Sequence, residues 1–188
     1  KKAEEIFKAF HSKSTISIRT NLTRCNPDEL RAMLEAEGVI VTPVDELNYA
    51  FVISGFDYLN GLQSFRDGLF YVQDISSMLV AQTAAPKKGD YVIDVCAAPG
   101  GKSTHIAELL QGSGHVLARD LTDNKVDMIE ENIERHGLNN MSAEVWDATV
   151  PDADSAGKAD ILICDLPCSG LGVLGRKKDI RYKMTPES

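Results

Sequence analysis

The sequence lacks the features that assign many chains to a class at once. None of its apolar runs approaches the ~20 residues that a membrane-spanning helix needs, and no secretory signal is visible. Its four cysteines form no C-x-x-C pair, and no histidine spacing indicates a zinc site. We therefore expect a cytoplasmic protein with reduced thiols and with neither a metal nor a membrane partner.

Positive charge is also scarce. The chain has 20 Lys and Arg against 28 Asp and Glu, a formal net charge of −8. This balance weighs against a nucleic-acid partner, because phosphate binding requires Lys and Arg. A local basic patch can still bind RNA inside an acidic chain, and Arg176–Lys178 with Arg181 and Lys183 is the best candidate. A solvated loop explains that run equally well.

Length allows one large domain or two small ones. The chain has 188 residues, 43% of them apolar, which suffices for a core. It begins at Lys1 without a Met, and Lys1–Phe10 have the apolar spacing of a short helix. We expect an upstream part, with this helix as the tail of a preceding helical domain.

The first third of the chain predicts a small α+β module over residues 1–67. Thr15–Leu22 alternate in the manner of a strand, and two further strands are expected at Val39–Thr42 and Tyr49–Ser54. The sequence alone leaves open whether this module binds RNA or serves packing or dimerisation.

A helix is expected between the first two strands of the module. Asn26 is placed to cap it, Pro27 fits its first position, and Glu29 can reach back to the cap. The expected apolar stripe and the terminating glycine are Leu30, Met33, Leu34 and Gly38.

The most informative stretch runs from Tyr91 to Ser103. Tyr91–Val95 predict a short strand, and Ala97–Gly101 predict a sharp turn. Apolar residues then recur with helical spacing at Ile106, Leu109 and Leu110. Strand, small-residue turn and helix are the local anatomy of a nucleotide-binding α/β unit. We expect Ser103 or Thr104 to help cap the helix.

Three nucleotide-site patterns compete for this turn. A phosphate-binding P-loop needs a glycine five residues before Gly101, where the chain has Cys96. The dinucleotide pattern G-x-G-x-x-G fails because only Gly100 and Gly101 are present. An S-adenosylmethionine site also uses a glycine-rich turn, and Asp120 lies about 20 residues beyond it, where a ribose-binding acid belongs.

Downstream segments predict a parallel sheet. A helix is expected at Asn124–His136, stopped by Gly137, and strands at Ala143–Trp146 and Asp160–Cys164. Such sheets bind ligands beyond the carboxyl ends of their strands. The acidic residues expected to converge on that rim are Asp94, Asp120, Asp147 and Asp165.

Two motifs resemble a known family. Asp94–Ser103 and Asp165–Gly172, preceded in order by Ile18–Asn21 and Gly68–Asp74, are similar to the RNA (cytosine-5) methyltransferases of the Sun/NOL1/NOP2 family, and most of all to its bacterial 16S rRNA branch. The resemblance implies a Rossmann-like methyltransferase domain over residues 68–188, incomplete at its C-terminus, behind an RNA-associated module.

The resemblance also implies the ligands and the site. The cofactor would be S-adenosyl-L-methionine, and the partner RNA, with 16S rRNA as the first candidate and the protein a monomer. Asp120 would bind the ribose hydroxyls, Asp147 would lie near the adenine amine, and Asp165 between cofactor and target base. The implied cofactor residues are Cys96, Ala97, Ala98, Pro99, Gly100, Gly101, Lys102, Asp120, Asp147 and Asp165.

Methylation of cytosine C5 calls for a cysteine, because a thiolate both adds to C6 and leaves well. The family uses two. Cys168, in a Pro-Cys pair, would assist product release with Asp165 as the second catalytic residue, and the attacking cysteine is expected in a Thr-Cys motif beyond Ser188. Cys164 is expected to be buried and inert, Cys25 structural, and Cys96 a wall of the cofactor pocket.

Three residues depart from the family pattern, namely Leu166, Lys178 and Tyr182, all near the expected RNA-facing loop. Two other functions stay open at this point. One is a cofactor-binding ribosome-assembly factor without catalysis. The other is a methyltransferase that acts on DNA or on a small molecule.

Overall fold

The computed structural model describes residue 5 and residues 16–168. The expected helix at Lys1–Phe10 and the basic patch around Arg176–Lys178 therefore lie outside the described residues. Ile16–Leu166 form one compact unit, to which the description below refers, whereas Pro167 and Cys168 belong to a second unit. Within the described ranges, no helix is long and apolar enough to cross a membrane, and no cluster of three or more His, Cys, Asp or Glu side chains could hold a metal ion.

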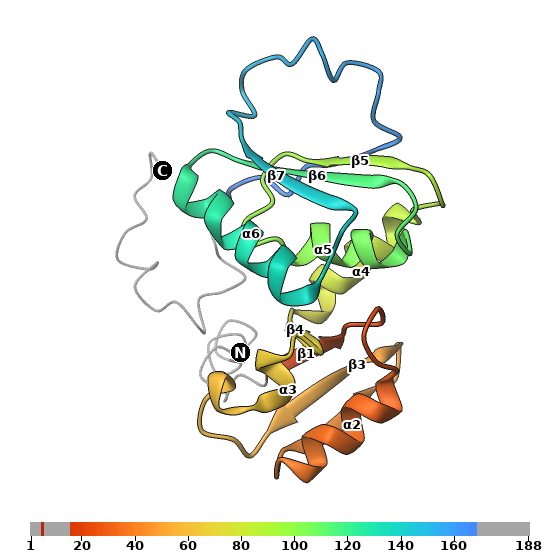
Figure 1. The fold of residues 1–188 in the computed structure, drawn as a ribbon, viewed down its shortest axis with the longest axis vertical. Helices are drawn as coiled ribbons and strands as arrows, with labels where there is room; N and C mark the ends of the chain where they lie inside the picture. Colours follow the sequence, from red (N-terminus) through yellow and green to blue (C-terminus); the bar gives the residue numbers. More distant parts are fainter. Residues whose placement is uncertain (1–4, 6–15, 169–188) are drawn as a thin grey trace. The chain divides into compact units, whose positions relative to one another are not determined.

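The first sheet is four-stranded and antiparallel. Its strand order is β2-β3-β1-β4, with β1 paired to both β3 and β4. Helix α2 packs against this sheet (Figure 1) through its buried leucines, Leu30 and Leu34. The strands are β1 (Ile16–Thr20), β2 (Ile40–Val44), β3 (Leu47–Ser54) and β4 (Phe70–Val72).

Helix α2 (Pro27–Ala36) begins as expected. The side chain of Asn26 accepts a hydrogen bond from the backbone N–H of Glu29 at 2.9 Å, and the Glu29 carboxylate accepts one from the Asn26 N–H at 2.9 Å. This reciprocal pair is a capping box. The apolar stripe is narrower than expected, because Met33 is 44% exposed. That part of the prediction was wrong, and only Leu30 and Leu34 reach the core.

Strand β4 connects the two halves of the compact unit. Two short helices precede it, the 3-10 helix η1 (Leu59–Gly61) and α3 (Gln63–Arg66). The strand pairs with β1 through Ile18–Val72, Arg19–Tyr71 and Thr20–Phe70. The first sheet thus extends past residue 68, where the sequence suggested a new domain. The domain boundary at 67/68 stays a prediction.

The second sheet is parallel, as predicted, and its strand order is β7-β6-β5-β8. From β5 the chain moves outward to β6 and β7 and then returns to the other side of β5 at β8. This reversal is the topological switch point at which open α/β sheets bind ligands. The strands are β5 (Tyr91–Asp94), β6 (His115–Asp120), β7 (Met141–Val145) and β8 (Ile161–Ile163).

Three helices cover one face of this sheet (Figure 1). Their buried side chains, among them Ile106, Leu110 and Ile129, form a core with Val92, Val116 and other strand residues. Helix α6 ends as predicted, because Gly137 adopts a left-handed conformation at φ 68°. The helices are α4 (Ile75–Ala84), α5 (Gly101–Leu109) and α6 (Asp123–His136).

The first sheet is joined to these helices by buried polar contacts. Asn21, just after β1, donates to the carbonyl of Gly68 at 2.8 Å and contacts the ring and the carbonyl of His136 at 3.3 Å. The His136 ring is stacked on Tyr71, with ring centroids 3.3 Å apart. Burial, aided by Arg135, lowers the pKa of His136 to about 2, so the ring is neutral.

Glycine conformation allows a sharp test of this junction. Gly68 and Gly38 both have positive φ, +66° and +83°. A Cβ at Gly68 would lie 2.1 Å from the carbonyl oxygen of Arg135, whereas one at Gly38 would meet nothing within 4 Å. We expect Gly38→Ala to lower the free energy of unfolding by about 1 kcal/mol through backbone strain. Gly68→Ala should cost about 1–3 kcal/mol more, since α6 must shift. Urea unfolding measures both, and equal losses would contradict the close approach.

Candidate functional site

The glycine-rich turn connects β5 to α5 at the carboxyl end of the second sheet. The backbone N–H of Ala97 donates to the carbonyl of Arg119 at 2.9 Å, which ties the turn to β6. The Ala98–Pro99 peptide bond is cis. Gly100 has φ +99° and is the N-cap of α5. Because α5 begins at Gly101, Ser103 and Thr104 lie inside the helix, and the prediction that either caps it was wrong.

A cavity of about 230 Å³ opens beside this turn. Seven of the ten predicted cofactor residues line it, namely Cys96, Ala97, Ala98, Pro99, Gly101, Lys102 and Asp165. The structure places them together, while their role in binding a cofactor stays a prediction. The cavity lies beside the ends of β5 and β8, at the switch point between the two strands.

Asp94, the last residue of β5, lies at the buried end of the cavity. Its side chain is 1% exposed. The Ser103 hydroxyl donates to one carboxylate oxygen at 2.6 Å, and the Cys96 N–H donates to the other at 3.4 Å. Burial raises the pKa of Asp94, although these two donors and Lys102 pull it down. Ser103 therefore stabilises a carboxylate rather than a helix end.

Asp165 follows β8 by two residues and is paired with the turn. Its carboxylate accepts a hydrogen bond from the ammonium of Lys102 at 2.5 Å, and the aspartate side chain is 57% exposed while the lysine side chain is 19% exposed. Sequence spacing gave Lys102 no partner. The structure thus pairs a largely buried lysine with a solvent-exposed carboxylate in the lining of the cavity.

Asp120 is the last residue of β6, and its carboxylate supports the backbone of the turn. It is 4% exposed, and its carboxylate accepts hydrogen bonds from the backbone N–H of Ala98 at 3.0 Å and of Leu121 at 2.8 Å. Lys125 forms an ion pair with it at 2.8 Å. Burial alone would raise the pKa of Asp120, but these three donors outweigh it and the pKa is lowered. Asp120 is therefore a carboxylate whose position is fixed by the turn.

The remaining predicted residues lie apart from the cavity lining. Gly100 is buried beneath the turn, against Ile129. Asp147 is exposed two residues beyond β7, and its carboxylate accepts hydrogen bonds from the N–H and hydroxyl of Thr149. Cys168 is exposed and belongs to the second unit, so its role stays a prediction.

The other three thiols have distinct surroundings. Cys25 is buried. Cys164 is exposed, because β8 ends one residue earlier at Ile163, so the prediction of a buried thiol was wrong. Burial and the neighbouring carboxylates of Asp120 and Asp94 raise the pKa of Cys96. That thiol stays protonated at neutral pH and can line the cavity, but it is a poor nucleophile.

Residues from the β4–α4 connection complete the cavity, and the site list drawn from the sequence omitted them. They are Val72, Gln73, Asp74 and Ser77, and Asp94 joins them from β5. One signal in the sequence could have identified these residues. The signal was the polar pair Gln73-Asp74 placed between an apolar strand and an apolar helix.

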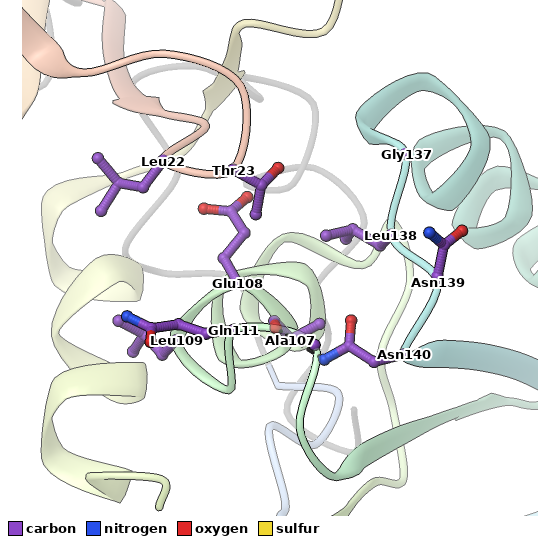
Figure 2. A pocket seen from close by; sticks show the side chains of 11 residues that line it. Leu22, Thr23, Ala107, Glu108, Leu109, Gln111, Gly137, Leu138, Asn139 and Asn140 are labelled. Atoms are coloured by element: carbon purple, nitrogen blue, oxygen red, sulfur yellow. Dashed lines mark hydrogen bonds between the residues drawn. The ribbon is translucent and has the colours of Figure 1, made fainter. Parts of the chain in front are cut away.

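A larger cavity of about 510 Å³ lies elsewhere (Figure 2), lined by Leu22, Thr23, Ala107, Glu108, Leu109, Gln111, Gly112, Gly137, Leu138, Asn139 and Asn140. It adjoins the C-terminal end of α5 and the loop before β7, at the amino ends of the strands. None of the predicted site residues lines it. Because parallel sheets bind ligands at the carboxyl ends of their strands, the smaller cavity is the candidate site.

The parallel sheet, its switch point and the glycine-rich turn define a Rossmann-like methyltransferase fold. The family model described as 16S rRNA methyltransferase RsmB/F matches residues 81–188, more than half of the chain. The chain therefore belongs to the RsmB/F family, as the sequence motifs predicted.

Individual relatives agree with this assignment. The probable ribosomal RNA small subunit methyltransferase B of Bacillus subtilis is 39% identical over 173 residues, which are 91% of this chain and 38% of that protein. The tRNA (cytosine(72)-C(5))-methyltransferase of Pyrococcus horikoshii is 44% identical over 116 residues, 61% of this chain and 29% of that protein. The crystal structure of PH0851 superposes with a TM-score of 0.92 at 29% identity and covers 99% of this chain and 42% of that one. The chain thus spans less than half the length of each relative.

The Ser103–Asp94 contact leads to a prediction for the site. Ser103→Ala should raise the pKa of Asp94 further, because the hydroxyl donor that stabilises its carboxylate is lost. It should also lower the free energy of unfolding at neutral pH by about 1–3 kcal/mol. Carboxyl-carbon NMR titration and urea unfolding measure the two effects. Ser76→Ala, at an exposed position of α4, is the control and should change neither; an unchanged Asp94 titration in Ser103→Ala would refute the contact.

Proposed function

We propose that the protein transfers the methyl group of S-adenosylmethionine to C5 of a cytidine in ribosomal RNA, with 16S rRNA as the first candidate. The observation that carries the proposal is the cavity at the β5–β8 switch point, lined by the glycine-rich turn in a chain of the RsmB/F family. The cytosine C5 position has support from the name of the Pyrococcus horikoshii relative, and the rRNA substrate from that of the Bacillus subtilis relative.

The residues around the turn fit this cofactor chemically. A nucleoside needs an acceptor for its ribose hydroxyls, and Asp120 is a carboxylate held against the turn at Ala98. A sulfonium cation and an ammonium favour nearby negative charge, which Asp94 and Asp165 provide. The α-carboxylate of the cofactor needs N–H donors. The buried Nε2 atom of Gln73 is such a donor and has no hydrogen-bond partner among the described residues.

When bound, the cofactor supplies an electrophilic methyl group on a sulfonium. We infer that a cysteine thiolate adds to C6 of the cytosine, so that the C5–C6 electron pair becomes available at C5 and would form the new bond to the methyl carbon. The methyl–sulfur bond would break in the same step, and its electron pair would leave with the sulfur as a neutral thioether. Loss of the C5 proton to a base then re-forms the C5–C6 double bond as the thiolate leaves. The target base must be unstacked to reach the cavity.

Within this scheme, Asp165 would orient the base. Its carboxylate accepts a hydrogen bond from Lys102, on the exposed side of the cavity. We assign it to accept a second one from the exocyclic N4 amino group of cytosine, which uracil lacks. Asp165 would thus select cytosine and hold its ring beside the cofactor. A monomeric state and a cytoplasmic location remain predictions.

The cofactor assignment is tested first at Asp120. Asp120→Ala should weaken S-adenosylmethionine binding at least tenfold, about 1.4 kcal/mol, because it removes the ribose acceptor and leaves the Ala98 N–H unpaired. Asp154→Ala, an exposed aspartate in the loop before β8, is the matched control and should bind normally. Calorimetric titration measures both. Binding of NAD instead of S-adenosylmethionine by the wild type, or equal affinities in both variants, would refute the site.

The covalent step is tested at Cys168 in the complete protein. If this thiol assists product release, Cys168→Ser should accumulate a protein–RNA adduct that survives denaturing electrophoresis, because the attacking thiolate can no longer be expelled efficiently. Transcribed 16S rRNA with a tritiated methyl donor is the substrate, and a DNA copy of the same sequence is the control. Loss of methylation without any adduct would instead assign the attack itself to Cys168. Methylation of the DNA copy alone would favour a DNA methyltransferase. Methylation of neither nucleic acid would favour a cofactor-binding ribosome-assembly factor without catalysis.

A further inference from the structure

Arg19 in β1 is the largest fully buried side chain among the described residues, at 0% exposure. Its guanidinium forms an ion pair with Glu108 of α5, donates to the Thr104 hydroxyl at 3.3 Å and lies 4.5 Å above the ring of Tyr71. Its Nε atom donates to the Oε1 atom of Gln73 at 2.8 Å. The guanidinium is thus held on several sides by planar or charged partners, and its direction is fixed.

This arrangement fixes the orientation of the side-chain amide of Gln73. The backbone of Gln73 is bound to β1 at both groups, since its N–H donates to the Ser17 carbonyl at 3.1 Å and its carbonyl accepts from the Ser17 hydroxyl at 2.7 Å. An arginine N–H can only donate, so the amide oxygen must face Arg19. The amide nitrogen, Nε2, must then face the other way.

The Nε2 atom of Gln73 faces the N-terminal end of α5. A Cβ placed on Gly101 would lie 3.8 Å from Nε2, and Gln73 lines the candidate cavity together with Gly101. Gln73 is 6% exposed, and Nε2 has no hydrogen-bond partner within the described part of the chain. A buried donor without a partner costs about 1–3 kcal/mol, so an acceptor is expected there. The first N–H groups of a helix also lack partners within the helix and favour a negative charge.

We propose that Gln73 donates a hydrogen bond to the α-carboxylate of the methionine part of S-adenosylmethionine, and that Arg19 is the positioning residue that aims it. The inference rests on the proposed function. The carboxylate is the anionic group of this cofactor, and it suits a site formed by an amide donor and a helix N-terminus. The ribose hydroxyls are donors and suit Asp120, on the far side of the turn. Gln73 lines the cavity, whereas Asp120 reaches the turn from the end of β6, so the two residues would hold opposite parts of the cofactor.

The consequence is that β1, a strand of the first sheet, becomes part of the cofactor site without touching the cofactor. Gln73 would contact it directly, whereas Arg19 would act through Gln73. Gln73 and Arg19 would distinguish ligands that have the α-carboxylate of the methionine part from ligands that lack it. S-Adenosylhomocysteine has the α-carboxylate, and 5′-methylthioadenosine has the same adenosine and sulfur without it.

The experiment compares the dissociation constants of these two ligands in the complete protein. Gln73→Leu should weaken S-adenosylhomocysteine by about tenfold or more and leave 5′-methylthioadenosine unchanged, because only the first ligand loses a hydrogen bond to a charged group. Gln63→Leu, at a glutamine of α3 whose side chain bonds to Asp67 and Arg66, is the matched control and should bind both ligands normally. Equal weakening of both ligands by Gln73→Leu would mean a purely structural role and would overturn the proposal. So would no weakening of either.

Arg19 needs a paired substitution, since removing one partner of a buried ion pair can unfold the protein. Arg19→Met with Glu108→Leu removes both charges and keeps the volume. This double variant should weaken S-adenosylhomocysteine about as much as Gln73→Leu, and adding Gln73→Leu to it should weaken binding little further. Full additivity would overturn the positioning role. A wild-type protein that binds neither ligand would instead refute the proposed function, so the two failures are distinguishable.

Discussion

The ion pair of Arg19 with Glu108 is the interaction on which the arrangement of the site depends. It joins the first sheet to the first helix after the glycine-rich turn, and both side chains are buried. Buried ion pairs contribute little net stability, because desolvation offsets the attraction. Their geometric requirement is strict, however, since every unpaired donor or acceptor is costly. The pair therefore acts chiefly to fix position. Thr104, Gln73 and Tyr71 are all located relative to it.

The carboxylates at the strand ends show how one residue type acquires different uses from its surroundings. Burial raises the pKa of Asp94 overall, although the hydroxyl of Ser103 supports its carboxylate. Asp120 receives backbone N–H groups and an ammonium, which lower its pKa. Asp165 faces solvent beside Lys102. The first two are held in place by contacts with the turn and with α5, while the third is exposed to solvent at the cavity.

Local patterns in the sequence predicted local structure well. The capping box at Asn26, the end of α6 at Gly137 and the parallel sheet depend on neighbouring residues or on simple periodicity, and all three were confirmed. The two family motifs predicted the family and located the turn. One error came from a contact between two elements, which a helix-start pattern does not show. Ser103 was expected to cap a helix, but it bonds to Asp94 on another element.

Gln73 is the clearest case of information that a sequence pattern does not contain. Its side chain is buried because a strand more than fifty residues earlier supplies Arg19 and Ser17. No periodicity within the segment indicates such a pairing. Cys164 illustrates the same limit at an element boundary, since one residue of difference in the end of β8 decides whether the thiol is buried or exposed.

The two buried histidines near this junction have a consequence for the protein's response to acid. His105 contacts Tyr49 edge-on and His136 stacks on Tyr71, and burial lowers the pKa of each to about 2. In the unfolded chain both would titrate near pH 6.5. The folded junction thus keeps a constant charge through the physiological range and does not sense pH. Below about pH 6.5 these histidines bind protons in the unfolded state but not in the folded state. The free energy of unfolding therefore falls as the pH is lowered. Mild acid would therefore lower the free energy of unfolding of the whole compact unit, while both histidine rings of the folded protein stay neutral.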